Sequence, residues 1–482
     1  MKQTCTDIPE TIEAVAKGKY RQKYHIMPPM GWMNDPNGLC KYGNEYHIFF
    51  QYSPDSPKGA LKTWGHYVTK DFVTMEYRGI ALKPDIYEDK DGVYSGSAFT
   101  GDGKMELFYT GNSKDEGDYD YVYTGRNANV VYVTSEDGTN FSDKTVVMTN
   151  KDYPSDYTCH IRDPKVWKEN ETYYMVQGGR KNAPEIGDKG AILLFSSKDK
   201  LNWKFEKEVT TKERFGFMWE CPDFFAVDGV ELLSFCPQGI EREKYRHYNG
   251  DLSGCFVTKD LWNGCGQNGT IVLDNPEFFE WDKGFEFYAP QTFADDKDRR
   301  ILIGWVGIPN PQYTNEATIK EGWQHCLTVP REIKVDKQEN GNVRILQNPI
   351  SEVEQLRERK VDVSSSEVII HTTAFDAEIT FVDGKEEKSI FFNEDLEISY
   401  QNGEMQLTFH NETGEGRQSR FVKMEEVYSI RILMDVSVME VYINGGEVVL
   451  TTRYYPKDTE KIKMKTKGFI KKNEIWELGT LR

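Results

Sequence analysis

Long apolar segments are absent from the sequence. No stretch approaches the ~20 consecutive apolar residues that a membrane-spanning helix needs. Residues 1–25 carry acidic and basic side chains throughout and lack the apolar core of a secretory signal. We therefore expect a cytoplasmic protein that does not enter a membrane.

Paired cysteine motifs are also missing. The eight cysteines are scattered, and none forms a Cys-x-x-Cys pair or shows the spacing of a zinc site. Cysteines of a cytoplasmic protein are normally reduced, and an even number does not establish disulfides. We expect free thiols.

Basic residues are fewer than acidic residues. The chain has 60 basic and 78 acidic residues, which gives a net charge of −18. Such a charge repels nucleic acid and anionic membrane surfaces at long range, so we expect neither as a partner. A small anionic substrate stays open, because a local basic cluster can override the overall field.

Long helical periodicity is nearly absent as well, and short strand-like runs take its place. Runs rich in Tyr, Phe, Val and Ile alternate with turns rich in Gly, Asp, Asn or Lys, as in YHIFFQYS (46–53), KMELFYTGN (104–112) and RRILIGWVG (299–307). The similar endings VTKDF, TSEDG, SSKDK and VTKDL suggest an outer-strand turn that recurs once per structural unit. This recurrence favours a β-propeller and leaves a sandwich-plus-barrel arrangement open.

The sequence pattern changes near residues 330–349, where strand-like segments give way to a charged segment, and this change suggests a second module. The charged segment SEVEQLRERKV that follows is predicted to be helical, as is a surface segment from about Ile8 to Tyr20. Further alternating segments then indicate two packed sheets. We predict an N-terminal extension (1–23), a catalytic domain (24–335), a linker (336–358) and a β-sandwich domain (359–482).

Three carboxyl groups stand in rigid, uncharged contexts. Asp35 lies among prolines and glycines in HIMPPMGWMNDPNG (25–38), and Asp163 follows Arg162, which can hold it ionised. Glu220 is flanked by Met, Trp, Cys and Pro, and burial among such side chains favours the protonated form that a general acid needs. Cleavage of a glycosidic bond with retention requires one carboxyl group that attacks and one that donates a proton. Each motif alone could equally be an ordinary turn.

Taken together and in this order, WMNDPNG (32–38), RDP (162–164) and ECP (220–222) resemble glycoside hydrolase family 32, the invertases, fructanases and sucrose-6-phosphate hydrolases. FFQYSP (49–54), YSGSA (94–98) and FYAPQTF (287–293) are similar to the same family. The resemblance implies an all-β chain with a five-bladed β-propeller and a central funnel, followed by a β-sandwich. It also implies that no metal or organic cofactor is needed.

The resemblance implies roles for matching residues. Asp35 would be the nucleophile, Asp163 would stabilise the transition state, and Glu220 would be the acid/base. Further residues would bind substrate: Asn34, Gln51, Trp64, Tyr94, Ser95, Arg162, Tyr288 and Trp305. Tyr94 and Tyr288 lie in strand-like runs, where an aromatic residue is commonly part of the core.

The expected activity is that of a retaining β-fructofuranosidase acting on sucrose or sucrose 6-phosphate. Arg242, Lys244, Arg246 and His247 form a basic run that could bind the phosphate, or a solvated loop. An exo-fructan hydrolase or a fructosyltransferase uses the same scaffold and stays open. A non-catalytic carbohydrate-binding protein is disfavoured, because all three carboxyl groups are present. We expect the sandwich to be structural, and a homodimer is left open.

Overall fold

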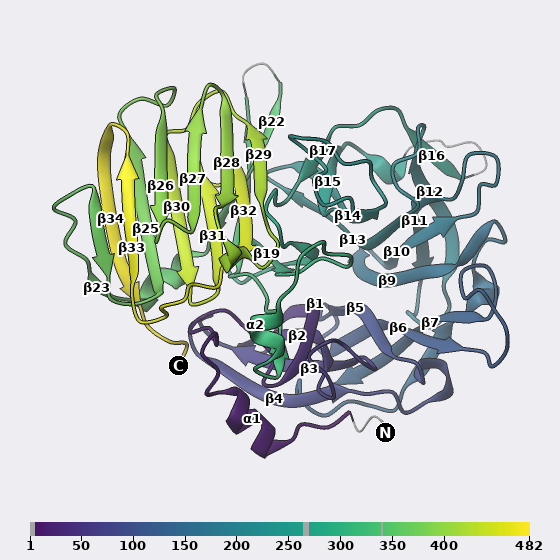
Figure 1. The fold of residues 1–482 in the computed structure, drawn as a ribbon. Coiled ribbons are helices and arrows are strands. Elements are labelled where there is room, and N and C mark those ends of the chain that lie inside the picture. The colour runs from purple at the N-terminus through teal and green to yellow at the C-terminus, as the bar shows by residue number, and fades with distance from the viewer. Residues whose placement is uncertain (1–4, 264–268, 339–340) are drawn as a thin grey trace.

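The computed structural model describes residues 5–263, 269–338 and 341–482, and these residues form two β-rich bodies side by side (Figure 1). Within the described residues, no helix is long and apolar enough to cross a membrane. Seven of the cysteines are free thiols, as expected, whereas Cys265 lies outside the described residues.

The first body contains five sheets between residues 31 and 349 of the described chain. Sheet one has β1 (Gly31–Tyr42), β2 (Glu45–Ser53), β3 (Thr63–Thr69), β4 (Met75–Leu82) and β20 (Trp323–Gln324). Sheet two has β5 (Val93–Phe99), β6 (Met105–Lys114), β7 (Arg126–Ser135) and β8 (Thr145–Met148). Sheet three has β9 (Tyr157–Glu169), β10 (Thr172–Lys181), β11 (Lys189–Ser197), β12 (Lys204–Thr211) and β16 (Thr270–Leu273). Sheet four has β13 (Met218–Val227), β14 (Val230–Gln238), β15 (Gly254–Thr258) and β17 (Phe278–Glu280), and sheet five has β18 (Tyr288–Ala294), β19 (Arg300–Trp305), β21 (Arg331–Lys337) and β22 (Val343–Pro349).

These sheets are the five blades of a β-propeller, which confirms the predicted fold of the first body. The opening strands β1, β5, β9, β13 and β18 contact one another in a closed ring around the centre. Apolar clusters fill the spaces between neighbouring blades, for example around Phe49 and Leu107 between blades one and two. Central strands such as β2 are therefore buried on both faces. β20 closes the ring by pairing in parallel with β1.

The recurring sequence endings lie at equivalent places in four blades. VTKDF, TSEDG, SSKDK and VTKDL follow the third strands β3, β7, β11 and β15. In the first three, the aspartates Asp71, Asp137 and Asp199 each accept hydrogen bonds from backbone N–H groups two and three residues further on. The prediction of one such turn per structural unit is confirmed for these blades.

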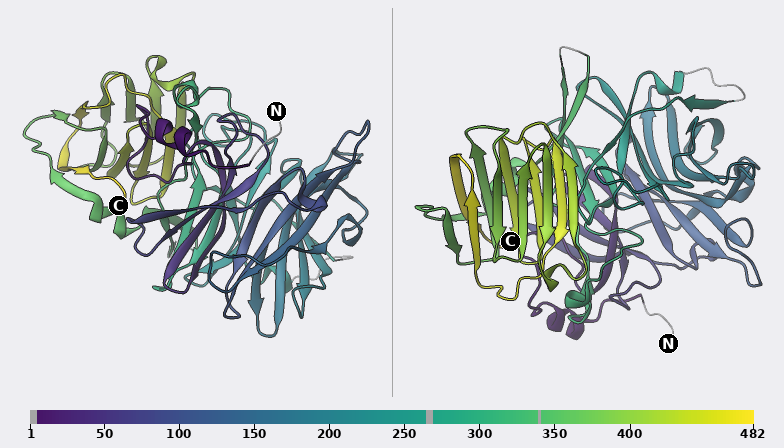
Figure 2. Two further views of the ribbon diagram at one scale, coloured as in Figure 1. Left: turned by 90° about the horizontal axis from the view of Figure 1, so that it is seen from below. Right: turned by 45° about the horizontal axis from the view of Figure 1, so that its top comes forward.

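The second body is a β-sandwich packed against one side of the propeller (Figure 2). One sheet has β23 (Arg357–Lys360), β34 (Ile470–Leu478), β25 (Ala374–Phe381), β30 (Ser429–Asp435), β31 (Val438–Ile443) and β32 (Val448–Arg453). The other has β24 (Glu367–Ile370), β33 (Ile462–Lys467), β26 (Lys388–Phe392), β27 (Leu396–Gln401), β28 (Glu404–Phe409) and β29 (Ser419–Lys423). Alternating apolar residues of both sheets form one core between them, which confirms the predicted sandwich.

Helices are short in the described chain. They are α1 (Pro9–Val15), α2 (Glu316–Ile319) and the 3-10 turns η1 (Tyr87–Asp89), η2 (Asn150–Asp152), η3 (Leu261–Asn263), η4 (Ser351–Leu356) and η5 (Glu412–Gly414). The predicted N-terminal helix is shorter than expected, because the chain turns after Ala16 to bring the Tyr20 N–H to Glu321.

The predicted helix over SEVEQLRERKV is wrong in its second half. Only a 3-10 turn, η4, forms, and residues 357–360 continue as β23, which pairs with β34. Arg357 is drawn into this sheet by the Asp376 carboxylate of β25. The division at residues 335 and 359 stays a prediction, and β22 of the fifth blade lies within the predicted linker.

A buried polar network joins the two bodies. His25, at the start of the propeller, contacts Asp435 through Nδ1 and Glu440 through Nε2, each at 2.9 Å. Glu440 also pairs with Arg331 of β21, which reaches Asp282. All of these side chains are fully buried.

Candidate active site

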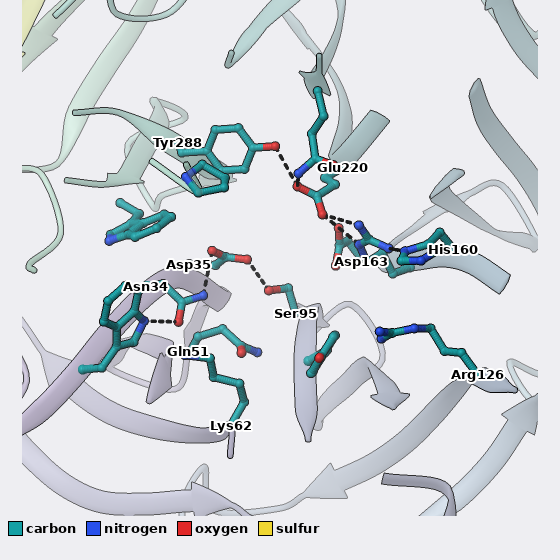
Figure 3. A pocket seen from close by; sticks show the side chains of 16 residues that line it. Asn34, Asp35, Gln51, Lys62, Ser95, Arg126, His160, Asp163, Glu220 and Tyr288 are labelled. Carbon is teal, nitrogen blue, oxygen red and sulfur yellow. Dashed lines mark hydrogen bonds and ion pairs between the residues drawn. The ribbon is translucent and has the colours of Figure 1, made fainter. Parts of the chain in front are cut away.

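A pocket of about 370 Å³ opens where the five opening strands meet. Its lining comes from all five blades and consists of Trp32, Asn34, Asp35, Gln51, Lys62, Tyr94, Ser95, Arg126, His160, Arg162, Asp163, Glu220, Gln238, Tyr288, Trp305 and Pro309 (Figure 3). The ring of strands therefore brings together the three predicted carboxyl groups, which are far apart in the sequence.

Each opening strand has a β-bulge at the pocket. In every blade two residues of the opening strand stand opposite one residue of the second strand: 34–35, 94–95, 163–164, 221–222 and 289–290. In four of these bulges the second extra residue, or the residue directly after the bulge, is a proline, which has no N–H to leave unpaired. A bulge turns side chains away from the regular alternation of a strand. The bulges explain how consecutive residues such as Asn34 and Asp35 both line the pocket.

Asp35 is held by two neighbours. Its Oδ1 accepts a hydrogen bond from Asn34 Nδ2 (3.0 Å), and its Oδ2 accepts one from Ser95 Oγ (2.5 Å). Trp32 Nε1 fixes the Asn34 amide in turn (2.8 Å). Burial raises the pKa of Asp35, while the hydrogen bonds from Ser95 and Asn34 oppose that rise. The site therefore holds an oriented carboxyl group with little surrounding water.

Glu220 faces Asp35 across the pocket (Figure 3). Arg162 donates to its Oε1 from Nε (2.9 Å) and Nη2, whereas Tyr288 OH (2.7 Å) and Gln238 Nε2 (2.8 Å) donate to its Oε2. The sequence suggested apolar surroundings for this carboxyl group, and that expectation is wrong. Met218, Trp219 and Cys221 are buried around the strand, but the carboxyl group itself meets hydrogen-bond donors.

Asp163 lies deeper, in the left-handed region with a φ of 63°. Its backbone N–H donates to Thr110 Oγ1 (2.9 Å), and its Oδ2 accepts from the Cys221 N–H (2.9 Å). Burial raises its pKa to about 7, although the positive charge of Arg162 opposes that rise. The charge of Arg162 thus favours the ionised form of Asp163, as expected, although Arg162 makes its hydrogen bonds to Glu220 and His160.

The remaining predicted binding residues divide into two groups. Asn34, Gln51, Tyr94, Ser95, Arg162, Tyr288 and Trp305 all line the pocket. Trp64 does not. It is fully buried behind the wall, where its Nε1 donates to the Tyr94 carbonyl oxygen (3.0 Å). Trp64 therefore supports Tyr94 from behind.

Several lining residues were missed by the sequence reasoning. They are Lys62, Arg126, His160, Gln238 and Pro309. His160 lies two residues before the RDP motif (162–164), on the same strand β9, and this nearness was a usable signal. Lys62, Arg126 and Gln238 lie in or beside second and third strands, and no motif marks them.

The basic run at 242–247 does not gather around a common point. Lys244 pairs with Glu404 of the sandwich (2.6 Å), and Arg246 pairs with Glu243 of its own loop (2.7 Å). His247 is buried, and burial lowers its pKa. Arg242 lines a cavity that lies beside the sandwich and is separate from the central pocket. Lys244 and Arg246 therefore already have carboxylate partners, and a phosphate site at this run stays a prediction.

The sequence matches models of a known family. The model of the glycosyl hydrolases family 32 N-terminal domain matches residues 25–349, and that of the family 32 C-terminal domain matches residues 343–477. The chain belongs to glycoside hydrolase family 32. The family resemblance seen in the three motifs is thus confirmed.

Individual family members are similar over nearly the whole chain. A sucrose-6-phosphate hydrolase of Bacillus subtilis (strain 168) is 36% identical over 451 residues, which cover 91% of this chain and 89% of the relative. A solved sucrose-6-phosphate hydrolase of Lactobacillus gasseri has a TM-score of 0.84 at 24% identity, covering 100% of this chain and 98% of its own. A family 32 β-fructofuranosidase of Bombyx mori has a TM-score of 0.81 at 27% identity, covering 100% and 99%.

Proposed function

We propose that the protein is a retaining β-fructofuranosidase that hydrolyses the fructosyl bond of sucrose or sucrose 6-phosphate. The observation that carries the proposal is the placement of Asp35 and Glu220 on opposite sides of one pocket, in a chain of family 32. The similarity to the Bacillus subtilis sucrose-6-phosphate hydrolase supports the choice of substrate.

In the proposed first step, Asp35 attacks C2 of the fructosyl unit. The bond from C2 to the glycosidic oxygen breaks, and Glu220 gives its proton to that oxygen. Asp163 accepts hydrogen bonds from fructosyl hydroxyls, and these strengthen as positive charge develops on the ring. In the second step, Glu220 takes a proton from a water molecule, whose oxygen attacks C2 and releases Asp35.

Other parts of the pocket suit the binding of a sugar. Trp32 and Trp305 lie with ring centroids 6.0 Å apart and offer flat apolar surfaces beside Asp35. Asn34 and Gln51 present amide groups to the same space. We propose that these residues, with Tyr94, Ser95 and Tyr288, bind the fructosyl unit, and that Trp64 acts only through Tyr94.

We also propose that the enzyme works in the cytoplasm, where a phosphorylated disaccharide is retained. Seven buried or half-buried free thiols are typical of a reducing compartment. The catalytic unit is proposed to be the propeller and the sandwich its structural support, since the two bodies share a buried polar network.

The proposal is tested by fructose release from sucrose and sucrose 6-phosphate with Asp35→Asn and Glu220→Gln. We expect Asp35→Asn to lose activity by at least about 10⁴-fold, because the nucleophile is gone. Glu220→Gln should lose activity on both sugars, but on an aryl fructoside, whose leaving group needs no proton, it should still perform the first step and release a burst of the phenol before slow hydrolysis. NMR of the first product should show the β-anomer of fructose.

The exposed carboxylate Asp362 supplies a matched control, since Asp362→Asn changes the same charge in the sandwich, between β23 and β24. Its activity should equal that of the wild type. Fructose release that survives in Asp35→Asn contradicts the mechanism, and a first product with inverted configuration contradicts retention. Preference for a fructan, or transfer of fructose to a second sugar, contradicts the proposed substrate and leaves the two carboxyl roles in place.

A further inference from the structure

Arg126 is the pocket-lining arginine whose charge has no counterpart. Arg162 is paired with Glu220, whereas no ion pair of the described residues includes Arg126. Arg126 Nε donates to the Tyr121 carbonyl oxygen (3.1 Å) and its Nη1 donates to Asn112 Oδ1 (2.6 Å). Both partners are neutral, so the guanidinium group is oriented without being neutralised. It points into the pocket from the start of β7 (Figure 3).

A row of hydrogen bonds links Arg126 to the proposed acid. Arg162 connects Glu220 to His160 Nδ1 (2.7 Å from Nη1), and His160 Nε2 lies 3.1 Å from the Tyr121 carbonyl oxygen. Arginine can only donate, so His160 Nδ1 is the acceptor and Nε2 carries the proton. Burial, together with Arg162 and Arg126, lowers the pKa of His160 to about 3, which keeps the ring neutral.

The Tyr121 carbonyl oxygen is therefore shared by two donors, His160 and Arg126. Tyr121 has a φ of 57°, in the left-handed region, which an amino acid other than glycine adopts only where its surroundings hold it. Its hydroxyl donates to carbonyl oxygens of the same loop. The loop thus fixes Arg126 along the wall that begins at Glu220.

The leaving sugar must lie along this wall, because its glycosidic oxygen receives the proton of Glu220. In sucrose 6-phosphate, six bonds separate that oxygen from the phosphorus atom on the glucosyl O6. At covalent bond lengths they span at most about 7 Å. Arg126 is linked to Glu220 through the Tyr121 carbonyl oxygen, His160 and Arg162, and it lies on the side that such a phosphate would reach.

The negative net charge of the protein gives a physical reason for placing an unpaired arginine in this pocket. The net charge of −18 repels a phosphate dianion, so a phosphorylated substrate needs local positive charge to remain in the pocket. A guanidinium group offers two parallel N–H donors that match phosphate oxygens. Lys62, the other unpaired cation of the lining, stands over Trp32 and near Asp35, on the opposite side from Glu220.

We infer that Arg126, positioned by His160 and Tyr121, binds the phosphate group of a 6-phosphorylated leaving sugar and so determines the preference for sucrose 6-phosphate over sucrose. This inference rests on the proposed function and assigns the phosphate to a wall of the catalytic pocket.

The test compares kcat/KM on sucrose 6-phosphate and sucrose for the wild type, Arg126→Met and Arg126→Lys. Arg126→Met should lower kcat/KM on sucrose 6-phosphate about 10- to 100-fold, mainly through KM, since a hydrogen-bonded charge pair is lost. Activity on sucrose should stay within about twofold of the wild type, because no phosphate is present to lose its partner. The kcat/KM of Arg126→Lys on sucrose 6-phosphate should lie between those of the wild type and Arg126→Met, since lysine keeps the charge but lacks the two parallel N–H donors.

Two comparison variants identify the source of any change. Arg242→Met removes the cation of the separate cavity and should leave the ratio of the two substrates unchanged. Lys62→Met removes the cation beside Asp35 and should lower activity on both sugars. An equal loss on both sugars in Arg126→Met, no loss on either, or a change of the ratio in Arg242→Met overturns the inference.

Calorimetry with glucose 6-phosphate and glucose separates this inference from the proposed function. Binding of glucose 6-phosphate that is lost in Arg126→Met supports the phosphate site even if the wild type releases no fructose. A wild type that releases fructose from both sugars, together with unchanged glucose 6-phosphate binding in Arg126→Met, leaves the proposed function standing and refutes the role of Arg126. Absence of both fructose release and binding refutes both.

Discussion

Ser95 controls the ionisation of the proposed nucleophile. Its hydroxyl donates to Asp35 Oδ2 and opposes the rise in the pKa of Asp35 that burial causes. Asn34 acts on the other oxygen in the same direction. An enzyme that attacks with a carboxylate requires the ionised form, so these two neighbours extend activity towards lower pH.

Ser95→Ala is expected to move the acidic limb of the profile of kcat/KM against pH to higher pH. Without this donor, fewer hydrogen bonds oppose the effect of burial, so the pKa of Asp35 rises further. Activity should be lost first at low pH, where more of Asp35 becomes protonated, and retained best above the new limb. Rates of fructose release from pH 4 to 9 measure the shift.

Ser97, on the same strand, provides the control. Its hydroxyl donates to the Pro164 carbonyl oxygen and makes no contact with Asp35. Ser97→Ala should lower stability and leave the position of the acidic limb unchanged. An acidic limb that stays in place in Ser95→Ala, or that moves equally in Ser97→Ala, rules out this role for Ser95.

At the scale of the elements, the bulged opening strands determine which side chains reach the pocket. The bulges of β9 and β13 place Asp163 and Cys221 at positive φ, and the Cys221 N–H then binds Asp163. Gly178 of β10 lies directly behind this junction. A Cβ atom at Gly178 would stand 2.0 Å from the Trp219 carbonyl oxygen and 3.2 Å from Glu220 Cα.

Gly178→Ala is therefore expected to push β13 away from β10 and to displace Glu220. Because the new contacts are with backbone, the strand itself must move, and we expect kcat to fall about 10- to 100-fold, since catalysis is sensitive to shifts of about 1 Å. KM should change less, because the other walls stay in place. Steady-state kinetics measure the effect.

Gly43→Ala is a suitable comparison for the loss of stability alone. Gly43 lies in the turn between β1 and β2 with a φ of 59°, and an added Cβ atom would meet nothing within 4 Å, so alanine costs about 1–2 kcal/mol through backbone strain alone. This variant should unfold at a lower temperature and retain kcat. A Gly178→Ala enzyme with normal kcat shows that the contact is relieved without moving Glu220.

The elements also show what the sequence could predict. Short strands and the turns after third strands were readable, because each depends on local alternation and on an aspartate that binds nearby N–H groups. Asp35, Asp163 and Glu220 were found because each lies in a rigid local motif. Arg126 could not be found, since only the closure of the ring brings the third strand of blade two to the pocket.

Two charged segments behave differently from what their sequence suggests, for a common physical reason. The basic run at 242–247 appeared available for a ligand, yet Lys244 is taken up by Glu404, 160 residues away. The charged segment after Pro349 appeared helical, yet its arginines join carboxylates of β25 and β34. In both cases the basic side chains pair with carboxylates far away in the sequence. The local charge pattern does not show which carboxylates the fold brings close.

At the scale of the whole molecule, His25 ties the propeller to the sandwich. Both ring nitrogens contact buried carboxyl groups of the sandwich, Asp435 and Glu440, and the His25 backbone N–H also donates to Asp435. These hydrogen bonds and charges outweigh burial and raise the pKa of His25 to about 9. Arg331 and His25 in turn lower the pKa of Glu440 to about 2. The interface is therefore a set of charges that are stable only together.

The raised pKa predicts how stability depends on pH. A histidine that titrates near 6.5 when unfolded and near 9 when folded contributes stability that is complete below about pH 6.5 and is lost as pH rises through about 9. A difference of this size corresponds to about 3 kcal/mol. Denaturant unfolding at a series of pH values from 6 to 10 should show this decline in the wild type.

His25→Gln removes the titrating group and should therefore remove this decline of the free energy of unfolding with rising pH. The variant should be less stable than the wild type by about 3–5 kcal/mol at pH 6, because Asp435 and Glu440 lose a buried cation, and the difference should narrow towards pH 10. His410→Gln, which alters an exposed histidine beside Glu397, should keep the wild-type slope. If the free energy of unfolding changes with pH in the same way for His25→Gln and the wild type between pH 6 and 10, His25 does not bind an extra proton in the folded state. The two bodies must then be held together by their apolar contacts and by Arg331.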